Sequence, residues 1–133
     1  MTKQEKTMNE KISVLVADDN IDFCTTMSFT LRHKGYDVAT AADGQETVEM
    51  VKKQPFDIIF MDVRMPVMNG VEAFREIKKI RPESRVVMMT AYVFEDLIGE
   101  VLKEGIYGVM FKPLDMKKVM VAVEEAGRPF VSK

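Results

Sequence analysis

Two apolar runs of the sequence end in carboxylates. Residues 12–17 lead into Asp18 and Asp19, and residues 57–62 end in Asp62. Three carboxylates brought together repel one another, and they stay ionised only beside a cation. Oxygen ligands without histidine or cysteine select a hard ion, and Mg²⁺ typically takes a few carboxylates while keeping several waters. These carboxylates are therefore candidate Mg²⁺ ligands.

A hydroxyl and an ammonium end two further apolar runs. Thr90 closes residues 85–90, and Lys112 follows residues 106–111. A bound cation leaves room for one more anion, such as a phosphate oxygen, which the Thr90 hydroxyl and the Lys112 ammonium would hold. An aspartate such as Asp62 can act as a nucleophile and carry a phosphoryl group. A single Asp at a strand end is more often a turn former or a helix N-cap, but the five side chains together favour phosphoryl chemistry.

Hydrophobic patterning predicts the elements that position these residues. Continuous apolar runs indicate strands buried on both faces, as in a parallel sheet covered by helices. The predicted buried strands are 12–17, 57–62, 85–90 and 106–111. The more polar run 36–41 is expected at an edge. Apolar residues between the strands recur at helical spacing, and the five predicted helices end near Gly35, Lys53, Pro82, Gly105 and Gly127.

Strand and helix alternate five times, with junctions of only a few residues. Right-handed crossovers force such a chain into a doubly wound α/β fold, a (βα)₅ parallel five-stranded sheet. Ligands bind beyond the carboxyl ends of the strands in these sheets, where the candidate residues gather. We predict one domain over residues 12–126, preceded by a flexible N-terminal segment (1–11) and followed by a short C-terminal tail (127–133).

The composition argues against several classes of function. The 133 residues fit one domain, and 19 basic against 21 acidic residues leave a net charge of −2. That balance argues against direct binding to nucleic-acid phosphates or to an anionic membrane surface. No run approaches the roughly 18 apolar residues of a membrane helix. Cys24, the one cysteine, excludes an internal disulfide and fits a reducing compartment, so we expect a cytoplasmic protein.

Together with the motif MPVMNG at residues 65–70, the candidate residues closely resemble the receiver domain of two-component response regulators. The resemblance extends over about residues 12–126. It implies a CheY-like, flavodoxin-like sheet with strand order 2-1-3-4-5. It also implies phosphotransfer from the phosphohistidine of a sensor kinase to Asp62.

The resemblance assigns a role to each matching position. The implied Mg²⁺ ligands are Asp18, Asp19, Asp62 and the Arg64 backbone carbonyl. Thr90 would bond the phosphoryl group, and Lys112 would pair with it. The bond between Lys112 and Pro113 is typically cis in this family. Arg64 and Tyr92 occupy positions that tune the lifetime of the aspartyl-phosphate, and because both are large we expect hindered hydrolysis.

The resemblance also implies partners. A sensor histidine kinase or a phosphotransfer protein would supply the phosphoryl group. A downstream effector, or an output domain missing from this chain, would read the surface formed by the fourth helix, the fifth strand and the fifth helix. We expect a monomer or a weak dimer. The expected module is not an enzyme, beyond its own phosphotransfer and autodephosphorylation.

The sequence departs from the family where the fifth strand carries its switch aromatic. Receivers usually have Tyr or Phe three residues before the strand lysine, and here that residue is Val109. Tyr107 lies two residues earlier and is expected to pack against the fourth helix. We therefore expect activation to pass mainly through the loop and helix after Thr90, including Tyr92 and Phe94. The charged side chains of that helix, expected on a solvated face, are Glu95, Asp96, Glu100, Lys103 and Glu104.

Two alternatives from other classes use similar chemistry. A Mg²⁺-dependent phosphohydrolase with an aspartate nucleophile, of the haloacid-dehalogenase type, also has a strand-end Asp. Such enzymes carry a second Asp two residues later, where this chain has Arg64, and they need a cap to select substrate. A flavodoxin would need a Ser, Thr or Gly phosphate loop after the first strand, where Asp18 and Asp19 would repel the phosphate of FMN.

Overall fold

The computed structural model describes residues 11–92 and 95–127. Strands and helices alternate five times along the chain, as predicted. The elements are β1 (Ser13–Ala17), α1 (Ile21–His33), β2 (Asp37–Ala41), α2 (Gly44–Lys53), β3 (Ile58–Asp62), α3 (Gly70–Ile80), β4 (Val86–Thr90), α4 (Asp96–Lys103), β5 (Gly108–Phe111) and α5 (Met116–Ala126).

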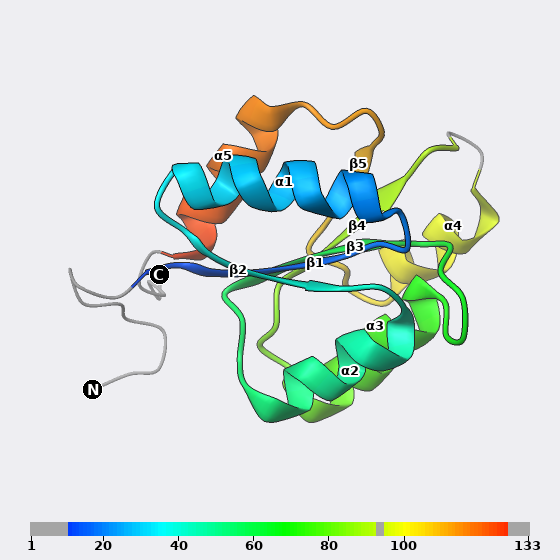
Figure 1. The fold of residues 1–133 in the computed structure, drawn as a ribbon. Helices are drawn as coiled ribbons and strands as arrows, with labels where there is room; N and C mark the ends of the chain where they lie inside the picture. The colour runs from blue at the N-terminus through cyan, green and yellow to red at the C-terminus, as the bar shows by residue number, and fades with distance from the viewer. Residues whose placement is uncertain (1–10, 93–94, 128–133) are drawn as a thin grey trace, which may run out of the picture.

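The five strands form one parallel sheet in the order β2-β1-β3-β4-β5, which confirms the predicted doubly wound fold. Figure 1 shows α1 and α5 on one side of the sheet and α2 and α3 on the other. Two buried apolar clusters, one on each face, hold these layers together. The cluster beneath α2 and α3 also includes Val101, so α4 packs on that same face.

Burial follows the position of each strand in the sheet. The residues of β4 are all buried, and those of β1 and β3 are buried except at one strand end. The prediction that residues 106–111 are buried on both faces is wrong, since β5 is only partly buried and Phe111 is 48% exposed. The reason is that β5 lies at an edge and pairs with β4 alone. The expected edge position of residues 36–41 is confirmed by β2.

Helix ends follow local chemistry. The side chains of Asn20, Asp43 and Asn69 accept hydrogen bonds from the first turns of α1, α2 and α3, which satisfies backbone amides that have no partner within the helix. Gly35 follows α1 with a φ of +96°, a conformation that glycine adopts without steric cost. No helix in the described ranges is both long and apolar enough to span a membrane.

Some predictions fall on other parts of the chain. The flexible N-terminal segment up to residue 10, the tail from residue 128 and the proposed participation of Phe94 all lie outside the described residues.

Candidate functional site

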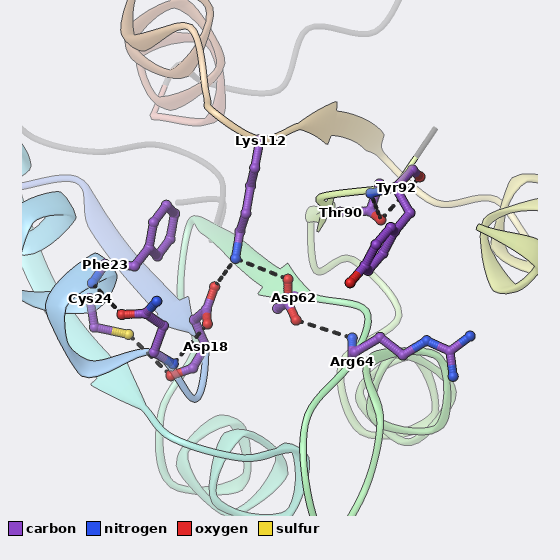
Figure 2. A network of polar contacts seen from close by, with 9 residues as sticks. Asp18, Phe23, Cys24, Asp62, Arg64, Thr90, Tyr92 and Lys112 are labelled. Carbon is purple, nitrogen blue, oxygen red and sulfur yellow. Dashed lines mark hydrogen bonds and ion pairs between the residues drawn. The ribbon is translucent and has the colours of Figure 1, made fainter. Parts of the chain in front are cut away.

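The carboxyl ends of four neighbouring strands carry the candidate residues. Asp62 closes β3 opposite Met89 of β4, and Thr90 closes β4 opposite Phe111 of β5. Asp18 follows β1, and Lys112 follows β5. Because parallel strands end at the same edge of the sheet, residues far apart in sequence meet there (Figure 2).

Three carboxylates form an acidic cluster at this edge. Asp18, Asp19 and Asp62 each offer one oxygen, and these oxygens lie within 4.8 Å of one another. Asp18 is 2% exposed, and the backbone amide of Asn20 donates to its Oδ1 at 2.9 Å. The Cys24 thiol donates to the Asp18 carbonyl at 3.2 Å, and burial raises the pKa of this thiol to about 11. A set of oxygen atoms at this spacing fits a hard cation such as Mg²⁺.

The Lys112 ammonium lies between two of the carboxylates, as Figure 2 shows. Its Nζ is 2.5 Å from Asp18 Oδ2 and 3.1 Å from Asp62 Oδ1. It also lies over the ring of Phe23, 4.4 Å from the centroid. Burial works against the charged ammonium, but the hydrogen bonds to Asp18 and Asp62 outweigh it and raise the pKa of Lys112. Lys112 therefore remains a cation that partly neutralises the cluster.

Backbone groups of Arg64 and Gly70 also fix the position of Asp62. The backbone amide of Arg64 donates to Asp62 Oδ2 at 3.1 Å. Gly70, the first residue of α3, passes so close that a β-carbon there would lie 2.4 Å from the Asp62 carbonyl oxygen. Burial raises the pKa of Asp62 above its ordinary value, against the opposing hydrogen bond from Lys112. The carboxylate is thus fixed in position and poorly solvated. Both properties suit a nucleophile that attacks an incoming group.

Thr90 and Arg64 lie at the same edge, but their side chains are engaged elsewhere. The Thr90 hydroxyl accepts from the Tyr92 amide at 3.1 Å and donates to the Tyr92 carbonyl at 3.3 Å. The Arg64 guanidinium binds Glu95. The Lys112-Pro113 peptide bond is cis, as the resemblance led us to expect.

Two side chains differ from their predicted surroundings. Glu95 was expected on a solvated helix face, but that prediction is wrong because its side chain is only 3% exposed. Its carboxylate accepts the Leu97 amide at the start of α4 and pairs with Arg64, so protein groups rather than water surround it. Tyr107 is half-exposed, and the Arg85 guanidinium lies over its ring, 5.9 Å from the centroid. Phe23, the aromatic neighbour of Lys112, was not among the predicted site residues, because a phenylalanine within a helical pattern gives no signal of a functional site.

The comparisons with known proteins agree with this geometry. Residues 14–124 match the response regulator receiver domain family. The chain is 40% identical over 117 residues to the transcriptional regulatory protein ZraR of Klebsiella oxytoca, covering 88% of this chain and 26% of that protein. It is 32% identical to the chemotaxis protein CheY of Thermotoga maritima, covering 86% of this chain and 97% of that protein. This chain thus spans about a quarter of the length of its ZraR relative.

A solved structure is similar in both sequence and shape. It is the receiver domain of a sensor histidine kinase from Pseudomonas aeruginosa, with a magnesium ion coordinated in its active site cleft. The two chains superpose with a TM-score of 0.79 at 27% identity, over 87% of this chain and 97% of that one.

Proposed function

The chain belongs to the response regulator receiver domain family, and from this premise we propose that Asp62 accepts a phosphoryl group from the phosphohistidine of a sensor histidine kinase or a phosphotransfer protein. The observation that carries the proposal is the position of the Asp62 carboxylate, 3.1 Å from the Lys112 ammonium and within the acidic cluster. Lys112 and a divalent cation held by the acidic cluster would together offset the charge of an anionic group added to this partly buried carboxylate.

The chain's own residues would each contribute to the transfer. An Asp62 oxygen forms a bond to phosphorus while the bond from phosphorus to the imidazole nitrogen breaks, and the electron pair leaves with that nitrogen. Lys112 neutralises charge on the transferred group, and the amide of Arg64 keeps the carboxylate oriented. Thr90 would exchange its bond to the Tyr92 backbone for one to a phosphoryl oxygen.

Asp18, Asp19, Asp62 and the Arg64 backbone carbonyl would hold Mg²⁺. Receiver domains bind this ion at an acidic pocket, and the relative from P. aeruginosa supports the same assignment. The chemistry that Mg²⁺ supplies when bound is neutralisation of the phosphoryl oxygens. Arg64 and Tyr92 would restrict water at the acyl-phosphate, which predicts slow autodephosphorylation.

The output surface would be formed by α4, β5 and α5. Several apolar side chains are exposed on these elements or directly before β5. They are Leu102, Tyr107, Phe111 and Val121. The ZraR relative is a transcriptional regulatory protein far longer than this chain, which supports a partner that is either a separate effector or an output domain. We place this signalling module in the cytoplasm, where its proposed phosphodonors act.

Labelling with acetyl phosphate tests the proposal. Asp62→Asn should abolish acid-labile incorporation of phosphate, because the nucleophilic oxygen is lost. Asp37→Asn, an exposed residue at the far end of β2, should label like the wild type. Undiminished labelling of Asp62→Asn would refute the assignment, and repeated turnover of an aryl phosphate would favour the phosphohydrolase.

A further inference from the structure

A bidentate ion pair joins the loop after Asp62 to the start of α4. Arg64 Nε donates to Glu95 Oε2 at 2.9 Å, and its Nη2 donates to Glu95 Oε1 at 2.7 Å. The two residues are 31 positions apart in the chain. The parallel bonds match the planar fork of arginine to a carboxylate, the strong geometry for such pairs.

The two partners of this pair differ sharply in exposure. The Arg64 side chain is 64% exposed and the Glu95 side chain only 3%. The exposed Arg64 side chain therefore has room to reorient, but its departure would leave a buried carboxylate without a cation, which is unfavourable unless Glu95 moves into solvent as well. The hydrogen bonds from Arg64 lower the pKa of Glu95, in keeping with a carboxylate that depends on this partner.

Glu95 also supports the first turn of α4. Its Oε1, which binds Arg64, accepts the Leu97 backbone amide at 3.4 Å as the N-cap of the helix. Within α4, whose residues are all described, only Val101 is buried. The other end of the helix is held by polar bonds from α3, where Arg75 pairs with Glu100 and Glu104. Ion pairs thus lie at both ends of α4, while Leu97 and Ile98 pack beside Val101 against the core cluster.

Asp62 lies next to this pair. The backbone amide of Arg64 bonds the Asp62 carboxylate, while the Arg64 side chain extends away from it (Figure 2). A phosphoryl group on Asp62 would add about −1.5 to −2 charges within two residues of the guanidinium. Phosphate oxygens accept the same fork of bonds from arginine as a carboxylate does. The phosphoryl group and Glu95 would therefore compete for one side chain.

We propose that Glu95 is a positioning residue that holds the Arg64 guanidinium away from the unphosphorylated Asp62, and that a phosphoryl group draws Arg64 off Glu95 and loosens the first turn of α4. This inference rests on the proposed function of Asp62. It supplies a route from the site to α4 in a chain whose fifth strand has Val109 and no aromatic ring at the usual switch position.

Beryllofluoride with Mg²⁺, a mimic of the phosphoryl group, tests the inference on the whole chain. We expect the NMR signal of the Arg64 Nε–H to shift on activation and the amides of Leu97 and Ile98 to exchange several-fold faster. Thr90 and Lys112 report separately whether the mimic has bound. If they do not respond in the wild type, the proposed function and this inference both fail. If they respond while the Arg64 signal stays unchanged, only this inference is overturned.

Matched variants separate positioning from general stability. Glu95→Gln keeps an oxygen for the Leu97 amide but removes the charge, so its free state should already show the fast exchange of α4, and beryllofluoride should add nothing there. Arg64→Gln, at an exposed position, should behave alike, and the double variant should equal either single one. Glu100→Gln removes a charge from α4 without touching Arg64 and should retain the wild-type response. A full response of α4 in Glu95→Gln would overturn the inference.

Discussion

At the scale of single residues, Lys112 supplies the positive charge next to the carboxylates of the site. This ammonium neutralises Asp18 and Asp62 together, and each of these carboxylates is also a candidate Mg²⁺ ligand. A divalent cation and Lys112 would therefore share the same oxygens and repel each other. Lys112, which we propose assists the phosphorylated state, would thus weaken the binding of metal in the unphosphorylated one.

Replacing Lys112 should tighten the binding of Mg²⁺. Lys112→Met removes the ammonium and frees Asp18 Oδ2, and we expect an affinity at least about fivefold higher, since unit charges at 4 Å interact by about 1 kcal/mol even in bulk water. Titration calorimetry measures the effect. Lys117→Met, an exposed position in the first turn of α5, should leave the affinity unchanged. Weaker binding to Lys112→Met would contradict the prediction.

Asp62 should make the stability of the metal-free protein depend on pH. Because burial raises its pKa, the ionised carboxylate is less favourable in the folded chain than in the unfolded chain. Asp62→Asn should therefore raise the free energy of unfolding at neutral pH. The gain should shrink as the pH falls through the raised pKa and disappear below the ordinary value of 3.8, where both states are protonated. Urea denaturation in the presence of a chelator measures the free energy of unfolding, with Asp37→Asn as the control. A lower free energy of unfolding for Asp62→Asn at neutral pH would contradict the prediction.

At the scale of elements, the start of α3 is fitted against the end of β3. The Gly70 amide donates to the Val63 carbonyl at 2.8 Å, and the missing side chain lets α3 begin against the Asp62 backbone. In the loop between them, Val67 has a φ of +70°, a left-handed conformation that is strained for a β-branched residue. The backbone at Asp62 is therefore set by close packing of the loop that follows it, at the cost of a strained conformation at Val67.

Two glycines should respond oppositely to alanine. Gly70→Ala places a β-carbon against the Asp62 carbonyl and should lower the free energy of unfolding by about 1–3 kcal/mol. Gly99, inside α4, has open space around it, so Gly99→Ala should raise stability by about 0.5–1 kcal/mol. Chemical denaturation of both variants measures the difference. Equal effects of the two substitutions would show that the close approach at Gly70 is unimportant.

At the scale of the whole molecule, the outer strand β5 connects the site to the proposed output surface. Lys112 directly follows β5, and this strand lies between the layers that contain α4 and α5. Val109 packs against the cluster beneath α4, whereas Tyr107 is half-exposed beneath Arg85. The Tyr107 ring is therefore in contact with Arg85 outside the site, which favours a route to α4 that does not use this ring.

Tyr107→Ala should leave activation intact. NMR shift changes on addition of beryllofluoride should still extend over α4 in this variant, because neither the Arg64–Glu95 pair nor the contacts between Thr90 and Tyr92 involve Tyr107. Arg85→Gln removes the partner of the ring without changing Tyr107 and serves as the matched control. If Tyr107→Ala erased the changes across α4 while Thr90 and Lys112 still responded, Tyr107 would be the switch.

The sequence by itself determined the fold and the neighbourhood of the site. Apolar runs, helical spacing and capping residues are local signals, and the strand ends predicted from them brought Asp18, Asp19, Asp62 and Lys112 to one edge, since parallel strands end together. Only the tertiary structure decided the burial of Glu95, the direction of the Arg64 side chain and the partial exposure of β5. These depend on where α4 and the edge strand lie relative to the rest of the chain. An ion pair between residues 31 positions apart leaves no periodic signal in the sequence, because it forms only once both elements are packed.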